Sequence, residues 1–130
     1  MNLLDENIPR RQRLILSSWR IGFREIGVEI GRPGIKDSEI IPLLHGLKSV
    51  TFFSLDRDFY KSYLCHLGYC IVYLDVEDYE VADFIRRFLR HPSLDTQAKR
   101  AGKVIRVAHT RLRVWRLHSE REQELVWPSS

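Results

Sequence analysis

The sequence lacks the features that mark membrane, secreted and zinc-binding proteins. No apolar run approaches the roughly 20 residues that span a bilayer, and acids stand near the start where a signal peptide needs a basic and then an apolar region. The only cysteines, Cys65 and Cys70, fit no Cys-x-x-Cys pattern, and the histidines are scattered. We therefore expect a cytoplasmic protein with buried free thiols and no zinc site.

The length and composition of the sequence are those of one globular domain. The chain has 130 residues, of which 44% are hydrophobic and 29% are charged, and this is enough to bury a core. The net charge of +4 permits an anionic partner. Arginines gather near both ends, while acids are enriched from Asp56 to Asp83. Such an arrangement would suit a negatively charged polymer bound across a metal-loaded site, although an ordinary solvated surface explains it as well.

The opening stretch, from Asn2 to Pro9, predicts a strand, a turn and the start of a helix. Two leucines lead into Asp5, and Asn7 and Pro9 are residues favoured at a helix N-cap and in its first turn. Ligands of open α/β sheets bind at the carboxyl ends of the strands, so Asp5 is a candidate site residue. Taken alone, the stretch is explained equally well by a plain strand–cap–helix junction.

Hydrophobic periodicity and turn residues predict alternating strands and helices along the rest of the chain. We expect helices over 8–20, 37–47, 58–67 and 81–89, strands over 23–26, 49–55 and 70–74, and a helical turn or two within 94–101. Pro42 should kink or shorten the second helix. Two β-rich runs, 104–108 and 111–117, suggest a hairpin. The sequence thus predicts a three-layer α/β domain over 1–118, with a mainly parallel sheet and a C-terminal β-hairpin, followed by a charged tail over 119–130 that frays unless it docks on a partner.

Carboxylates follow two of the predicted strands. If the strands that end before Asp5 and Asp56 are parallel neighbours, those two side chains and Asp58 meet at one edge of the sheet, and Asp37 can join them from the start of the second helix. Crowded carboxylates need a compensating cation, and oxygen ligands suit Mg²⁺ or Mn²⁺. Such an ion can activate water for phosphodiester cleavage. The alternative is that each aspartate merely caps a helix.

Several blocks of the sequence resemble one protein family. The opening Leu3–Pro9, the segment around Asp37-Ser38-Glu39-Ile40 and the run Ser54–Phe59 are similar, in order and spacing, to blocks of the small PIN-like proteins predicted to be toxin nucleases. The resemblance covers most of the chain and implies a PIN-like fold and Mg²⁺- or Mn²⁺-dependent ribonuclease activity. It also implies a cognate antitoxin protein.

The resemblance also assigns roles by position. Asp5, Asp56 and Asp58 would be the metal ligands, with Asp37 as a further catalytic carboxylate. Ser54 would orient a carboxylate or water, whereas Glu6 ranks lower because successive strand residues face opposite sides. Asn7 is expected to cap the helix.

Three functional readings compete. The first is a metal-dependent endoribonuclease, the toxin of a type II toxin–antitoxin system, which contacts RNA phosphates through Arg10, Arg11, Arg111 and Arg113. The second is a non-catalytic PIN-like module that binds RNA or protein; in either case tryptophans could line an antitoxin or homodimer surface, although core packing is their commoner fate. A phosphatase or receiver domain is disfavoured because no lysine ends a later strand.

Overall fold

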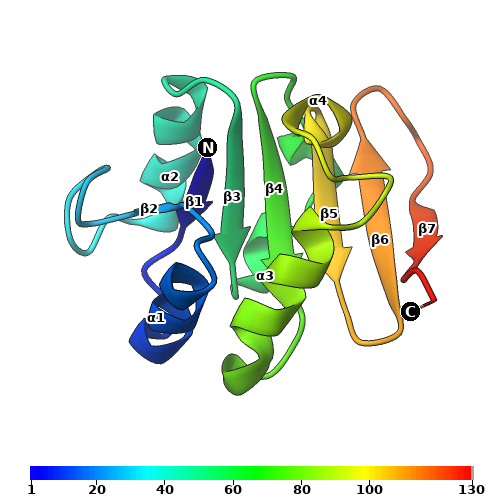
Figure 1. Ribbon diagram of the computed structural model, residues 1–130. Coiled ribbons are helices and arrows are strands. Elements are labelled where there is room, and N and C mark those ends of the chain that lie inside the picture. The colour runs from blue at the N-terminus through cyan, green and yellow to red at the C-terminus, as the bar shows by residue number, and fades with distance from the viewer. Residues whose placement is uncertain (130) are drawn as a thin grey trace.

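A seven-stranded sheet forms the middle layer of the computed structural model, which describes residues 1–129 (Figure 1). Its spatial order is β2-β1-β3-β4-β5-β6-β7. Strands β1 to β5 run parallel, and β6 and β7 are each antiparallel to the preceding strand. The α/β class and the mainly parallel sheet expected from the sequence are confirmed. The strands are β1 (Asn2–Leu4), β2 (Arg24–Glu25), β3 (Val50–Ser54), β4 (Tyr69–Leu74), β5 (Lys103–Val107), β6 (Arg111–Arg116) and β7 (Gln123–Val126).

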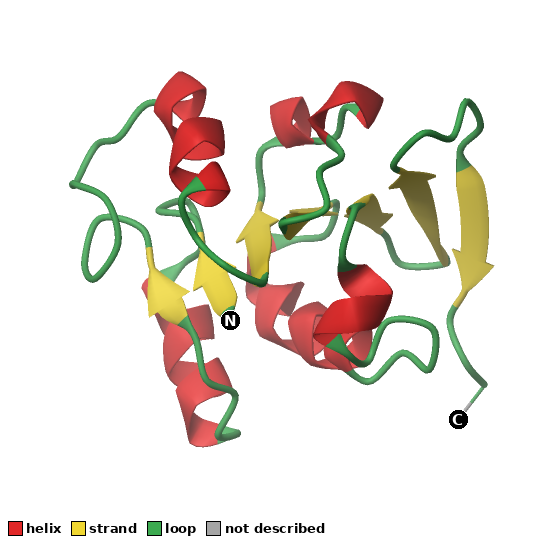
Figure 2. Ribbon diagram, turned by 90° about the horizontal axis from the view of Figure 1, so that it is seen from above, coloured by secondary structure: helices red, strands yellow, loops and turns green. Residues whose placement is uncertain are grey.

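Helices cover both faces of the sheet (Figure 2). One face packs against α1 (Arg10–Ser18) and α3 (Val81–Leu89), and the short α4 (Gln97–Arg100) lies on the same side. The other face packs against α2 (Asp37–His45). None of the helices within residues 1–129 has the length and apolar content that a membrane crossing requires.

The two central strands, β3 and β4, are buried along their whole length. This burial explains why their sequences are continuous apolar runs rather than alternating ones, because helices cover both faces of a parallel sheet. Leu4 of β1 lies beside Phe53 of β3 in the parallel pairing. The carboxyl ends of β1 and β3 are therefore neighbours at one edge of the sheet.

The helix expected over 58–67 is absent. The chain instead makes two 3-10 turns, η1 (Arg57–Phe59) and η2 (Ser62–Leu64). The Asp56 side chain accepts a hydrogen bond from the Asp58 amide and so caps η1. Phe59 is buried with its ring edge-on to Phe52. Phe59 therefore anchors the chain against the sheet directly after β3.

The segment expected to fray as a tail forms a strand of the sheet. β7 pairs with β6 from Gln123 to Val126. Just outside β7, the Trp127 indole donates to the Ala108 carbonyl at 2.8 Å and Glu122 accepts from the Tyr60 hydroxyl. Residues 123–126 therefore belong to the sheet rather than to a fraying tail, and Ser130, the last residue of the expected tail, lies outside the described residues. Only Leu125 of this edge strand is partly buried, so its sequence does not show the alternation of apolar and polar residues that predicts a strand.

The starts of α1 and α2 also differ from expectation. Pro9 occupies the N-cap of α1, and no side chain caps that helix, so the assignment of Asn7 as the cap was wrong. In α2 the cap residue is Lys36, and Asp37 stands in the first turn. The helix continues through Pro42 to His45. The proline costs this helix one backbone hydrogen bond without ending it.

Candidate active site

The carboxyl ends of β1 and β3 bring together the aspartates singled out in the sequence. Asp5 directly follows β1, and its amide donates to the Phe53 carbonyl at 2.9 Å. Asp56 stands two residues beyond the end of β3. The adjacency and parallel direction on which the predicted convergence depended are both present.

The Asp5 carboxylate is held on both oxygens. Oδ2 accepts a hydrogen bond from the Ser54 hydroxyl at 2.6 Å, and Oδ1 accepts one from the Glu6 amide at 2.8 Å. The residue is only 5% exposed. Burial raises the pKa of Asp5 above its usual value, and the two hydrogen bonds oppose that rise. Asp5 is therefore a fixed carboxylate whose charge is poorly solvated.

Ser54 is the centre of this network. Its buried hydroxyl donates to Asp5 and accepts from the Asp56 amide at 3.0 Å and from the Asn7 side-chain amide at 3.1 Å. One donor and two acceptor positions are all that a hydroxyl offers, so its orientation is determined. Asn7 also accepts from the Leu55 amide at 3.2 Å. Asn7 therefore connects the turn after β1 to the end of β3.

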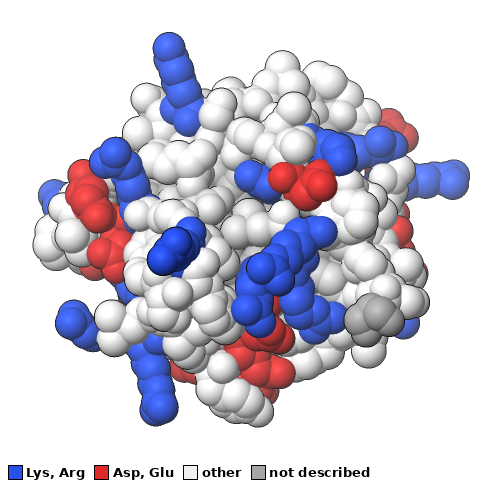
Figure 3. Space-filling model, in the orientation of Figure 1, with Lys and Arg blue, Asp and Glu red and all other residues white. Residues whose placement is uncertain are grey.

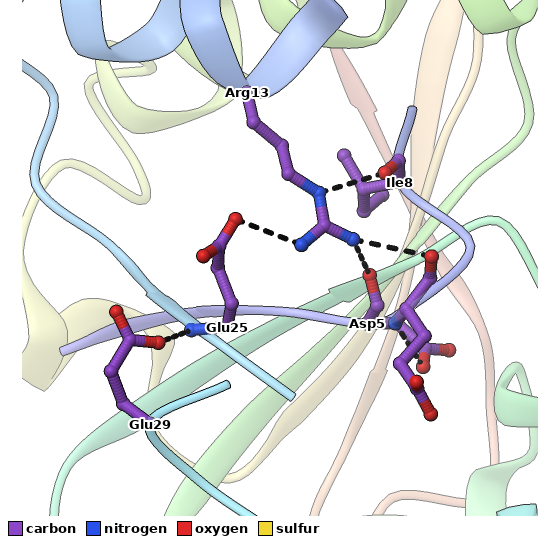
Figure 4. A network of polar contacts seen from close by, with 6 residues as sticks. Asp5, Ile8, Arg13, Glu25 and Glu29 are labelled. Carbon is purple, nitrogen blue, oxygen red and sulfur yellow. Dashed lines mark hydrogen bonds and ion pairs between the residues drawn. The ribbon is translucent and has the colours of Figure 1, made fainter. Parts of the chain in front are cut away.

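Arg13 fixes the turn that carries Asp5 (Figure 4). Its guanidinium donates to the Ile8 carbonyl at 2.8 Å, to the Asp5 carbonyl at 2.9 Å and to the Glu6 carbonyl at 3.2 Å. It also forms an ion pair with Glu25 at 2.9 Å. The charge of Arg13 thus supports the backbone under Asp5, whose carboxylate stays available on the other side.

Asp37 and Asp56 form a close acid pair at the same edge. A hydrogen bond with Asp56 is the largest cause of a rise in the pKa of Asp37 to about 6, followed by desolvation and by the charges of Asp56, Asp5 and Asp58. Two carboxylates in contact cannot both ionise without cost. The charges of Asp5, Asp56 and Asp58 therefore all act on Asp37.

The donor set has the chemistry of a hard-cation site. Within residues 1–129, no three His, Cys, Asp or Glu side chains form a group that could hold a metal ion as placed. Mg²⁺, however, is usually held by one or two carboxylates and several waters, and the Asp37–Asp56 pair supplies two. Carboxylate oxygens are the ligand type that Mg²⁺ and Mn²⁺ prefer, so the chemistry of these side chains is compatible with either ion.

Glu6 lies away from this group. Its carboxylate accepts from the Gly34 amide at 3.0 and 3.1 Å and lies so close to Gly27 that a Cβ there would be 2.9 Å from Glu6 Oε2. Gly27 also has a φ of +86°, which favours glycine. The side chain of Glu6 therefore holds the loop between β2 and α2.

The four arginines proposed to contact RNA lie on two different elements. Arg10 and Arg11 are exposed at the start of α1, in the helix layer opposite α2; that side of the molecule carries many Lys and Arg side chains (Figure 3). Arg111 and Arg113 stand on β6 and pair with Glu124 and Glu122 at 2.9 and 3.0 Å. These two also line a pocket of about 160 Å³ with Arg106.

Sequence reasoning missed Arg13 as a site residue and misplaced Asn7. A signal for Arg13 was present, because it lies three residues before the buried Leu16 and so on the inner side of α1. No sequence pattern points to the contact of Asn7 with Ser54, which joins residues 47 apart.

No family model, curated protein or solved structure matches this chain.

Proposed function

We propose that this protein is a metal-dependent endoribonuclease that holds Mg²⁺ or Mn²⁺ at the edge where β1 and β3 end. The observation that carries the proposal is that Asp5 and Asp56 follow the neighbouring parallel strands β1 and β3 and are joined through the Ser54 hydroxyl. The charges of Asp5, Asp56 and Asp58 also act on Asp37, whose pKa is raised to about 6. A divalent cation relieves this repulsion. When bound, it supplies a Lewis acid for the phosphate and lowers the pKa of a coordinated water.

The residues of the chain have separable roles in this proposal. Asp56 and Asp37 would hold the ion together with Asp5, and Asp58 adds negative charge beside them. Ser54 and Arg13 are positioning residues, because they fix the carboxylate and the backbone of Asp5. The buried position of Asp5 keeps competing water from one side of the site.

Arginines near the same edge support an anionic substrate. Arg106, Arg111 and Arg113 line one pocket beside the turn between β5 and β6, and that turn follows the carboxyl end of β5. Arginine forks match phosphate oxygens. These arginines pair with Glu122, with Glu124 of β7 and with Asp75, so RNA phosphates would displace those acids on binding.

The resemblance to PIN-like toxins extends the proposal to its context. It suggests the toxin of a type II toxin–antitoxin system, held in check by a cognate antitoxin protein. A gene for a small DNA-binding protein next to the gene for this chain, and coexpression of the two as a stable complex, would support that context. Normal growth of cells that express the wild-type chain alone would argue against it.

A non-catalytic RNA-binding module of the same fold is the second candidate. The observation that favours it is that no three acids within residues 1–129 are already arranged around a metal position. Such a module would bind RNA through its arginines and would show no dependence on Mn²⁺.

The decisive experiment measures Mn²⁺ affinity by calorimetry and cleavage of a structured RNA, for the wild type and for Asp5→Asn and Asp56→Asn. Asp95→Asn is the matched control, because Asp95 is exposed and pairs with Lys99 far from the site. We expect both site variants to lose cleavage and to bind Mn²⁺ at least tenfold more weakly, which corresponds to about 1.4 kcal/mol. Unchanged affinity and cleavage in both variants would refute the proposed site.

A further inference from the structure

A second pocket lies at the opposite end of the sheet from the aspartates. It has a volume of about 420 Å³ and opens between the starts of β1 and β2 and the helix α4. Its lining includes Asn2, Phe23, Arg24, Gln97 and Arg100, and no acid side chain is among the residues that line it. The function proposed above gives this pocket no role.

Arg100 is a buried cation without a carboxylate partner. It is 8% exposed, and its guanidinium donates to Thr51 Oγ1 at 2.9 Å, to the Leu94 carbonyl at 2.8 Å and to Gln97 Oε1 at 3.4 Å. All three acceptors are neutral. The nearby Asp95 is paired with Lys99 at 2.8 Å. Within residues 1–129, Arg100 forms no ion pair, although buried charges are ordinarily paired.

The contacts of Arg100 use only part of its hydrogen-bonding capacity. A guanidinium carries five N–H donors in a fixed fork, and the three bonds above use three of them; Arg100 also lines the pocket. The three bonds to α4, β3 and the segment before α4 also hold the side chain in one place. Its charge is therefore preorganised rather than mobile.

Arg24 adds a second positive charge to the same pocket. It is exposed at the start of the edge strand β2, and it too forms no ion pair in the described part of the chain. The adjoining wall is fixed by the Asn2 side chain, which donates to the Gly22 carbonyl at 3.0 Å. Met1 also lines the pocket, and its α-ammonium donates to the Ser49 carbonyl at 2.8 Å. Two arginines, this ammonium and two amide side chains thus line a pocket whose lining contains no acid.

We propose that this pocket binds the phosphate group of a small phosphomonoester. A phosphomonoester carries a charge of about −2 near neutral pH, which offsets the charges of Arg24 and Arg100 beside the Met1 ammonium, and the arginine fork matches phosphate oxygens. The pocket volume lies in the range of small-molecule sites and leaves room for an organic group beside the half-buried ring of Phe23. Arg100 supplies the buried charge, and Arg24 closes on the phosphate from the exposed side.

The test titrates the full chain with ribose 5-phosphate, with inorganic phosphate and with ribose, using calorimetry and the amide NMR signals of residues 22–24. We expect saturable binding of the two phosphate compounds, with ribose 5-phosphate the tighter, and no binding of ribose. Arg24→Gln should weaken binding about tenfold, the effect of one charge-assisted hydrogen bond. Arg90→Gln is the control, because Arg90 is exposed at the end of α3, outside this pocket.

Arg100→Lys retains the charge but loses the fork, and it should weaken binding while keeping the fold. If that variant unfolds, the comparison of Arg24→Gln with Arg90→Gln still tests whether the pocket binds phosphate. Absence of saturable binding in the wild type, or equal affinity in the wild type and Arg24→Gln, would overturn the proposal. Asp5→Asn should leave this binding unchanged, so failure of the proposed nuclease site would be distinguishable from failure of this pocket.

Discussion

Substitution of Ser54 by alanine tests whether the Asp5 carboxylate is held as the structure indicates. The substitution removes the hydroxyl that donates to Asp5 at 2.6 Å and accepts from two other groups. Loss of a hydrogen bond to a charged group costs about 1.5–3 kcal/mol. The half-buried Asp56 amide adds about 1 kcal/mol, whereas the exposed Asn7 regains water. We therefore expect a loss of about 2–4 kcal/mol of unfolding free energy.

That loss should depend on pH. The Ser54 hydrogen bond lowers the pKa of Asp5, so Ser54→Ala raises the folded-state pKa further above the ordinary value. The alanine variant is then penalised fully near pH 8, where Asp5 is ionised in both the folded and the unfolded state. The penalty shrinks as the pH falls through the folded-state pKa of Asp5, because a protonated carboxyl no longer needs that donor.

The assay is guanidinium unfolding at about pH 8 and about pH 4, accompanied by thermal unfolding. For a chain of this length, about 4 °C of melting temperature is lost per kcal/mol, so the variant should melt roughly 8–16 °C lower at the higher pH. Ser17→Ala, at an exposed position of α1, is the control and should stay within about 0.5 kcal/mol. A loss in Ser54→Ala below that level, equal at both pH values, would refute the described network.

Two further predictions concern the residues around Asp5. The pKa of Asp37 is raised from its ordinary value of 3.8 to about 6. Its contribution to stability is therefore fully present below pH 3.8 and is lost as the pH rises through about 6. The unfolding free energy of Asp37→Asn should therefore exceed that of the wild type by about 1 kcal/mol at pH 8, a value reduced for solvent screening, and should equal it near pH 3.5. A gain at both pH values in denaturant titrations would contradict this. Arg13→Met removes three carbonyl contacts and the ion pair with Glu25, so it should cost about 2–4 kcal/mol and speed amide exchange around Asp5, whereas exposed Arg11→Met should do neither.

The sequence was sufficient to predict those parts of the fold that depend on local patterns. The apolar runs of β3 and β4 and the helical spacing of α3 appear in the structure close to the expected positions. The meeting of Asp5 with Asp56 followed from one assumption, that two buried strands are parallel neighbours. That assumption depends on topology rather than on any particular contact.

What could not be predicted depends on contacts between distant segments. The 3-10 turns after β3 stand where a helix was expected, and there Phe59 packs edge-on against Phe52 of the sheet. The strand β7 forms by pairing with the edge of β6. Asn7 was assigned by the usual preference of helix caps, but its partner Ser54 lies on another strand. Helix and strand propensities reflect the local sequence and carry no information about partners that lie far away along the chain.

The pKa directions separate a functional explanation of the aspartates from a structural one. A carboxylate that serves as a helix cap accepts backbone hydrogen bonds and faces a positive dipole, and both lower its pKa. Asp56 accepts a hydrogen bond from the Asp58 amide at the start of η1, which is a structural role for that residue. Asp37, in the first turn of α2, has a raised pKa instead, as does the buried Asp5. At neutral pH the ionised forms of both destabilise the fold, and a bound divalent cation would remove that cost.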